Sequence, residues 1–233
     1  MIITVDIGNS HQNYALFDDN EKFIRKGDFQ DLDLVVKEFP SSKILVSSVD
    51  DEFLNQIPGN FHLVRKFFTK GNYIDMPTQY TQSIGEDRLA VIYYLYKYNQ
   101  QNKVIIDSGS FTTIDFVDSK GHKGGFILPG LQAIRSTFTH GKHLKKVEIN
   151  MQAQASSQPP TFTQEAMEQG MLASFHYPIL GIIRKFHAEN IFLTGGNGQR
   201  LAEFLKTQGD FKMAYSAELL HRSLCFIAKR MLT

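Results

Sequence analysis

Two segments of the chain share one pattern, in which an apolar run, a tight turn carrying aspartate and glycine, and a second β-like run follow one another. In the first segment, residues 1–5 precede the turn Asp6-Ile7-Gly8-Asn9-Ser10 and residues 14–17 follow it. In the second, residues 104–106 precede Asp107-Ser108-Gly109-Ser110 and residues 113–117 follow it. A strand, a turn and a returning strand therefore occur twice. This repetition constrains the chain to a duplicated fold with two related halves.

The residue types in both turns suit phosphate binding. Glycine lets the backbone approach an anion, while backbone N–H groups and a serine hydroxyl can surround phosphate oxygens. The aspartate can hold a metal ion or orient a water molecule. A single Asp-x-Gly turn is most often ordinary hairpin chemistry. Two such turns in matching contexts predict a fold that closes on a nucleoside triphosphate.

Composition narrows the class of protein. A length of 233 residues fits one large domain or two small ones, and the repetition favours two. The formal net charge of +1 gives no bulk attraction to nucleic acid or to an anionic membrane. No apolar run reaches the length of a membrane span, and the single cysteine, Cys225, suits a reducing cytoplasm and a buried place in the last helix. We expect a cytoplasmic protein that binds neither nucleic acid nor membrane.

The order of apolar runs predicts an α/β protein with mixed sheets covered by helices. We place one domain at residues 1–100 and the second at residues 101–233. Residues 69–85 contain Gly, Pro, Asn and Gln with little periodicity, so they are predicted to form a long loop of functional rather than filler character. A helix is expected from Asp87 to Tyr98, and another from Thr163, with Thr163 as its N-cap.

Two further segments have both a structural and a functional interpretation. In Gly85-Glu86-Asp87-Arg88, the aspartate either caps a helix or acts as a general base beside an arginine that anchors substrate, and spacing alone favours the cap. Gly195-Gly196 follows a predicted strand and either makes a simple turn or lets a base or ribose lie against the backbone. Both alternatives stay open for Gly195-Gly196. The pair His140 and His143 has no further ligand to complete a metal site.

Six motifs occur in a fixed order along the chain, at residues 6–10, 85–88, 107–110 with 112–115, 124–130, 163–170 and 194–196. Taken in this order they resemble the type III pantothenate kinase family, and the resemblance spans nearly the whole chain. No single motif carries it. The resemblance implies two ribonuclease-H-like domains of the actin and sugar-kinase superfamily, with mixed sheets flanked by helices.

The resemblance also implies an activity. Members transfer the γ-phosphoryl group of ATP to the primary hydroxyl of pantothenate, giving 4'-phosphopantothenate, in the first step of coenzyme A biosynthesis. The family uses Mg²⁺ and a monovalent cation, K⁺ or NH₄⁺, and forms homodimers. The partners implied are therefore pantothenate, ATP and a second copy of the chain.

Carried onto this sequence, the family pattern makes Asp87 the general base and Asp107 the metal ligand. The implied substrate-binding residues are Tyr80, Gly85, Glu86, Asp87, Arg88 and Thr163. The implied ATP-binding residues are Asp6, Ile7, Gly8, Asn9, Ser10, Gly109, Ser110, Gly195 and Gly196.

The sequence departs from the family pattern in three places. Ser10 and Ser110 replace the usual threonine, which keeps the hydroxyl but loses the methyl group that stiffens the rotamer. Residues 11–13 lack the lysine that many members carry there, which predicts weak affinity for ATP. Two alternatives remain, a kinase of the same fold for another small hydroxy acid and a non-catalytic ATP-binding regulator.

Overall fold

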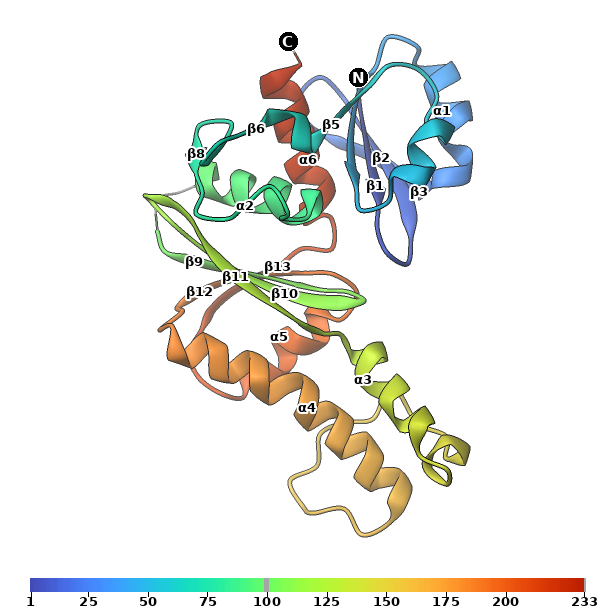
Figure 1. Cartoon of the computed structure of the whole chain (residues 1–233), viewed down its shortest axis with the longest axis vertical. Helices are drawn as coiled ribbons and strands as arrows, with labels where there is room; N and C mark the ends of the chain where they lie inside the picture. The colour runs from blue at the N-terminus through green and yellow to red at the C-terminus, as the bar shows by residue number, and fades with distance from the viewer. Residues whose placement is uncertain (99–100, 233) are drawn as a thin grey trace. The chain divides into compact units, whose positions relative to one another are not determined.

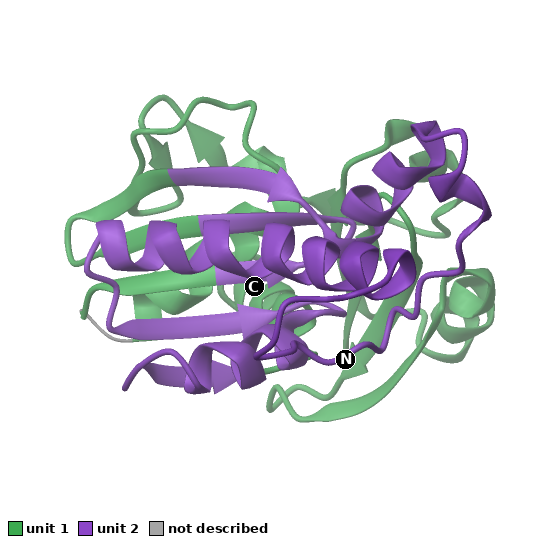
Figure 2. Ribbon diagram, turned by 90° about the horizontal axis from the view of Figure 1, so that it is seen from below, with its two compact units in different colours: residues 1–105, 115–124, 216–233 green, residues 106–114, 125–215 purple. Residues whose placement is uncertain are grey.

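The computed structural model describes residues 1–98 and 101–232, and the chain divides into two compact units (Figure 2). Unit 1 holds residues 1–105, 115–124 and 216–233, and unit 2 holds residues 106–114 and 125–215. The predicted domain boundary after residue 100 adjoins residues 99–100, which lie outside the described residues. That boundary stays a prediction.

A five-stranded mixed sheet forms the centre of unit 1, with strand order β3-β2-β1-β4-β5 (Figure 1). β1 pairs antiparallel with β2 and parallel with β4, and β4 pairs parallel with β5. The strands are β1 (Ile2–Ile7), β2 (Gln12–Phe17), β3 (Phe23–Asp28), β4 (Lys43–Ser48) and β5 (Phe61–Leu63). The helices of this unit are α1 (Leu32–Glu38), α2 (Glu86–Tyr98) and α6 (Leu219–Met231).

The second sheet repeats this plan with the order β11-β10-β9-β12-β13. Its strands are β9 (Lys103–Ser108), β10 (Phe111–Asp118), β11 (Gly121–Pro129), β12 (Asn190–Thr194) and β13 (Lys212–Tyr215), and β12 pairs parallel with β13. The helices of unit 2 are α3 (Leu131–Thr137), α4 (Thr163–Lys185) and α5 (Gly198–Lys206). In both sheets the first strand of a three-stranded meander is central, and the fourth strand lies on its other side. The prediction of two related mixed sheets is confirmed.

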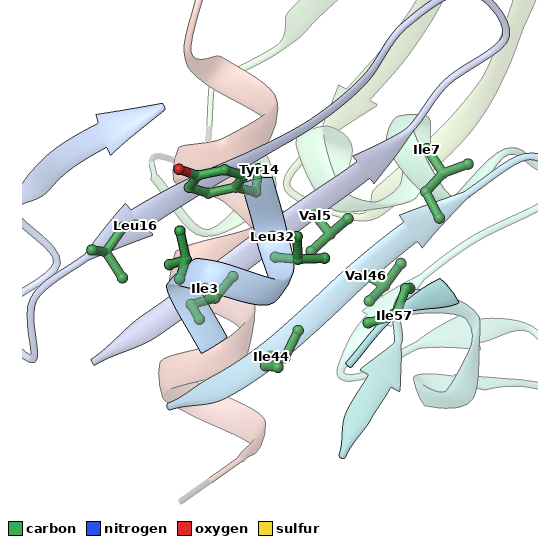
Figure 3. Packing of buried hydrophobic residues seen from close by; sticks show 10 residues of the cluster. Ile3, Val5, Ile7, Tyr14, Leu16, Leu32, Ile44, Val46 and Ile57 are labelled. Atoms are coloured by element: carbon green, nitrogen blue, oxygen red, sulfur yellow. The ribbon is translucent and has the colours of Figure 1, made fainter. Parts of the chain in front are cut away.

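The core of the first sheet follows from the alternation of side chains along its strands (Figure 3). Because successive side chains of a strand point to opposite faces, Ile3, Val5 and Ile7 of β1 lie on one face. Ile44 and Val46 of β4 extend the same apolar surface. The cluster also contains Tyr14, Leu16, Leu32, Val35 and Ile57. This packing fixes the end of β1, from which the first predicted phosphate loop begins.

The prediction of a loop at residues 69–85 is wrong for its first part. Residues 68–77 form a small three-stranded sheet of β6 (Phe68–Thr69), β7 (Asn72–Tyr73) and β8 (Met76–Pro77). Tyr73 and Met76 are fully buried, and the Asp75 carboxylate in the turn accepts hydrogen bonds from Tyr93, Lys97 and Arg230. Strands of two residues are too short to show an alternation of apolar and polar residues, so no periodicity marks them in the sequence.

Other predictions can be compared with the structure directly. The prediction that Thr163 caps α4 is wrong, because Phe162 is the N-cap and Thr163 is the first helical residue. The predicted burial of Cys225 in the last helix is confirmed. Among the described residues, none of the helices combines the length and the apolar character that a membrane span requires.

The buried side chain of His221 connects α6 to the first sheet through hydrogen bonds. Its two ring nitrogens lie 2.8 Å from Thr4 Oγ1 on β1 and 2.5 Å from Asn13 Oδ1 on β2. Burial, aided by the charge of Lys26, lowers the pKa of His221 from 6.5 to about 3. The folded protein therefore binds fewer protons than the unfolded chain between these two pH values.

We predict a specific loss of stability in acid. The contribution of His221 is complete above its unfolded pKa of 6.5 and decreases as the pH falls toward about 3. The difference in unfolding free energy between wild type and His221→Gln should shrink by about 1.4 kcal/mol per pH unit between about pH 6 and pH 4. Denaturant unfolding at several pH values measures it, and a difference independent of pH would contradict the buried, uncharged state.

Candidate active site

The first predicted phosphate loop joins β1 to β2 in unit 1. The Gly8 N–H donates to His11 O at 3.1 Å and closes the turn, which leaves Asn9 and Ser10 exposed and Asp6 half-buried. A Cβ at Gly8 would lie 3.2 Å from His11 O, so the turn is tight at this residue. The loop therefore presents backbone and short polar side chains to solvent, as an anion site requires.

A cavity of about 570 Å³ adjoins this loop and contains a basic residue that sequence analysis did not consider. Ser10 and Asn13 line it together with Lys26 of β3. Lys26 pairs with Ala15 of β2, and this pairing of neighbouring strands places Lys26 near the loop that precedes β2. The ammonium group also lies 4.0 Å from a carboxylate oxygen of Glu218. Unit 1 thus places a lysine near the loop although residues 11–13 contain none.

The second predicted phosphate loop follows β9 and is assembled from three segments of unit 2. The Gly109 N–H donates to Phe111 O at 2.9 Å, the Asn197 N–H donates to Ser108 O at 2.9 Å, and the Gly130 N–H donates to Ser110 O at 3.2 Å. A Cβ at Gly130 would overlap the carbonyl oxygens of Ser110 and Gly109. The ends of β9, β11 and β12 therefore meet at this loop.

Gly195 fits this assembly because it has no side chain. Its φ of +82° belongs to the left-handed region, and a Cβ there would overlap the Asp107 carboxylate and lie 2.7 Å from the Ser108 backbone. Asp107, predicted to be the metal ligand, is half-buried at this contact. The residues alone left the role of Gly195 open, and the family resemblance implies that it binds ATP, which stays a prediction. Its backbone lies directly against the second loop.

Next to Gly196 lies a cavity of about 640 Å³ within unit 2. One wall is α5, where the Arg200 guanidinium donates to the carbonyl oxygens of Met151 and Ala153 and so holds the chain beyond residue 150. Another wall is formed by His176 of α4, whose ring stacks on Phe204 with centroids 4.2 Å apart. Burial lowers the pKa of His176 to about 4. The cavity has the size and mixed polarity of a small-molecule site.

The segment Gly85–Arg88 begins α2 in unit 1. The Leu89 N–H donates to Gly85 O at 3.0 Å, and Asp87 Oδ1 accepts from the Arg88 N–H at 2.8 Å, so the carboxylate lies over the first turn. A Cβ at Gly85 would overlap that carboxylate. Burial raises the pKa of Asp87 above its usual value, against the opposing effect of Arg88. A half-buried carboxylate with a raised pKa is a stronger base than an exposed aspartate.

Arg88 forms the most buried ion pair of the site. Its Nε and Nη2 donate to the two oxygens of Asp115 at 2.9 and 2.7 Å, and the exposed fractions of the two residues are 6% and 1%. Burial alone would lower the pKa of Arg88, but the hydrogen bonds and charge of Asp115 raise it above the usual range. Asp115 lies within one of the six motifs, but no role was predicted for it. Its signal in the sequence was a charged residue between the apolar residues Ile114 and Phe116.

The other predicted substrate residues lie in different settings. Tyr80 is half-buried, and the Arg88 Cζ lies 5.0 Å from the centroid of its ring. Glu86 is buried and points to Arg65, whose N–H donates to it at 3.2 Å, and burial raises the pKa of Glu86 to about 7. Thr163 is exposed at the start of α4 in unit 2. Unit 1 therefore brings Tyr80, Gly85 and Arg88 together, while the roles of Glu86 and Thr163 stay predictions.

Solved structures share this fold. A conserved Baf family protein from Campylobacter jejuni superposes with a TM-score of 0.65 at 26% identity, over 98% of each chain. An activator of 2-hydroxyisocaproyl-CoA dehydratase from Clostridium difficile, with ADPNP bound, superposes with a TM-score of 0.62 at 9% identity, over 98% of this chain and 94% of that one. A putative N-acetylmannosamine kinase from Listeria monocytogenes shares the fold as well, with a TM-score of 0.54 at 11% identity, over 100% of this chain and 99% of that one.

Sequence comparison gives a narrower assignment. A type III pantothenate kinase of Campylobacter jejuni strain RM1221 is 29% identical over 205 residues, which cover 87% of each chain. The type III pantothenate kinase of Campylobacter hominis is 27% identical over 232 residues, which cover 98% of each chain. The profile of the family described as type III pantothenate kinase matches residues 2–185. The chain therefore belongs to the type III pantothenate kinase family.

Proposed function

We propose that this protein transfers the γ-phosphoryl group of ATP to the primary hydroxyl of pantothenate and so catalyses the first step of coenzyme A biosynthesis. The observation that carries this proposal is the start of α2, where a carboxylate with a raised pKa lies beside a buried arginine. Family membership supports the identity of the substrates. We also propose that the enzyme acts in the cytoplasm as a homodimer.

Asp87 and Arg88 would act on the acceptor. Phosphoryl transfer needs little covalent chemistry from the protein, so catalysis depends on positioning the hydroxyl and on accepting its proton. Asp87 would accept that proton, and its raised pKa favours this role. Arg88 uses Nε and one Nη2 proton on Asp115, and the remaining guanidinium protons can form a second fork that suits the carboxylate of pantothenate.

We assign phosphate binding to the turn after β9 in unit 2 and, separately, to the turn after β1 in unit 1. The backbone and hydroxyl of Ser110 would hold phosphate oxygens beside Gly109, whose own N–H closes the turn onto Phe111 O, and residues 6–10 would offer a second set of donors. The adenosine would lie against Gly195 and Gly196 and enter the neighbouring cavity. This division of roles agrees with the local geometry of each loop.

Mg²⁺ fits the carboxylate of Asp107. Within the described part of the chain no group of three or more His, Cys, Asp or Glu side chains is arranged as a metal site. An ion that takes most of its ligands from phosphate and water needs few protein carboxylates, as is usual for Mg²⁺ beside a nucleotide. When bound, Mg²⁺ would neutralise phosphate charge. The monovalent cation, K⁺ or NH₄⁺, is proposed from the family alone.

Coupled ADP release tests the function. The purified protein is assayed with ATP and Mg²⁺, with and without pantothenate, in buffers that contain Na⁺, K⁺ or NH₄⁺. We expect ADP release that depends on pantothenate and increases with K⁺ or NH₄⁺. Release that requires another hydroxy acid would favour a different kinase of this fold, and ATP binding without any acceptor-dependent release would favour a non-catalytic regulator.

Replacing the proposed base is the first mutational prediction. Asp87→Asn keeps the size of the side chain but cannot accept the proton, so kcat should fall by about 100-fold to 10,000-fold. The unfolding midpoint should be no lower than that of wild type, because burial already disfavours the ionised carboxylate. In the wild type, turnover should fall as the pH decreases through the raised pKa of Asp87. Asp210→Asn, at an exposed residue of unit 2, is the matched control. Turnover of Asp87→Asn close to wild type would remove Asp87 from the mechanism.

The second mutational prediction concerns the nucleotide side. Gly195→Ala places a methyl group against Asp107 and Ser108 at a positive φ, a strain of about 1–3 kcal/mol. We expect the KM for ATP to increase about tenfold or more while the KM for pantothenate changes little. Gly181→Ala is the control, because a Cβ at that residue of α4 meets no atom within 4 Å. An unchanged KM for ATP would separate Gly195 from nucleotide binding.

A further inference from the structure

We propose that Asp115, His122 and Thr78 are positioning residues that hold Arg88 and Tyr80 together as the binding surface for the carboxylate end of the acceptor. The inference rests on the proposed function for the identity of that acceptor. It gives a positioning role to Asp115, His122 and Thr78, which take no direct part in the proposed phosphoryl transfer. All five residues belong to unit 1.

A continuous chain of hydrogen bonds connects these residues. Because a carboxylate only accepts, His122 Nε2 donates to Asp115 Oδ1 at 3.0 Å, beside the bonds from Arg88. The other ring nitrogen, Nδ1, lies 3.0 Å from Thr78 Oγ1. In the neutral ring with its proton on Nε2, Nδ1 is an acceptor, so the Thr78 hydroxyl donates to Nδ1 while its oxygen accepts from the Tyr80 N–H at 3.1 Å. The chain thus runs from the backbone of Tyr80 to the guanidinium of Arg88.

Because the residues of this network are buried, the loss of any one of its hydrogen bonds is costly. Thr78 and Arg88 are 7% and 6% exposed, and Asp115 and His122 are 1% exposed. Water cannot reach these groups to replace a lost partner, so breaking one bond leaves a buried polar group unsatisfied. Bonds in such a network also strengthen one another in a region of low dielectric constant. Loss of one member should therefore loosen the others.

The backbone around Thr78 lies against the start of β11, the strand that carries His122. Thr78 forms a parallel bridge with His122, and the Gln79 N–H donates to His122 O at 3.3 Å. Gly121, at a φ of +113°, lets Pro77 approach, since a Cβ there would overlap the Pro77 carbonyl oxygen. The start of β11 thus carries the segment before Tyr80, and the side-chain network fixes the register of this contact.

Tyr80 and Arg88 form the surface that the network would hold. The Tyr80 ring stacks on the His122 ring, with centroids 5.8 Å apart and planes 17° apart. The Arg88 guanidinium carbon lies 5.0 Å from the Tyr80 centroid, a cation–π distance. His122 thus touches Tyr80 directly and Arg88 through Asp115. A carboxylate on Arg88 would leave the neighbouring apolar part of the acceptor against the tyrosine ring.

Thr78 provides a selective test, because Thr78→Val removes the hydroxyl with little change in volume. Thr78→Ser keeps the hydroxyl, and Thr69→Val makes the same replacement at an exposed threonine of the small sheet. We expect Thr78→Val to raise the KM for pantothenate about tenfold, with kcat and the KM for ATP within about twofold of wild type. Thr78→Ser and Thr69→Val should resemble wild type. An unchanged KM for pantothenate in Thr78→Val, or equal losses in all three constants, would overturn the positioning role.

A measurement without substrate separates this inference from the proposed function. Long-range ¹H–¹⁵N spectra report the two ring nitrogens of each histidine, and the signals of His122 are those lost in His122→Gln. The network predicts that the His122 Nδ1 resonance moves in Thr78→Val but stays in place in Thr78→Ser and Thr69→Val. An unmoved resonance would overturn the network whatever the substrate. A moved resonance in a protein that does not phosphorylate pantothenate would support the network and contradict only the proposed function.

Discussion

The buried ion pair between Arg88 and Asp115 is the interaction on which the proposed acceptor site depends. Removing two charges from water costs several kcal/mol for each ion, and apolar residues of the same volume often give equal or greater stability. The two oxygens of Asp115 are satisfied by Arg88 and His122 at distances of 2.7–3.0 Å, so the cost is largely offset. Such a pair is better explained by the position it gives Arg88 than by the stability it adds.

The duplicated sheet explains why polar loops of the same kind occur twice. In each half the central strand ends in a tight turn that contains glycine, and the next strand lies beside the central one. In the first sheet these two strands, β1 and β2, are antiparallel. The core along β1 and β4 makes the strand rigid up to the turn. Ser10 and Ser110 both lie in these turns, so the loss of the threonine methyl affects loop stiffness rather than the supply of hydroxyl groups.

Local patterns in the sequence predicted the strands, helices and turns, which depend on residues close together in the chain. The apolar runs before both turns, the helix that begins near Asp87 and the glycine-containing turns were all recognisable, and the motif order indicated the family. The contacts that complete the site join residues far apart in the chain, such as Thr78 with His122 and Arg88 with Asp115. No periodicity encodes such pairs. The N-cap of α4 was misassigned because Thr163 has the right residue type but lies one position inside the helix.

We infer that the main role of the Arg88–Asp115 ion pair is to position Arg88 for substrate binding. The direct measurement compares Asp115→Leu with the double variant Arg88→Met/Asp115→Leu, by denaturant unfolding and by ADP release with pantothenate. Asp115→Leu alone leaves a buried, unpaired arginine and should lose roughly 3–5 kcal/mol of stability. The double variant should regain part of that stability, because the buried His122 Nε2–H still lacks its acceptor, and it should release no pantothenate-dependent ADP. A double variant that turns over pantothenate at the wild-type rate, with the wild-type KM, would contradict the account.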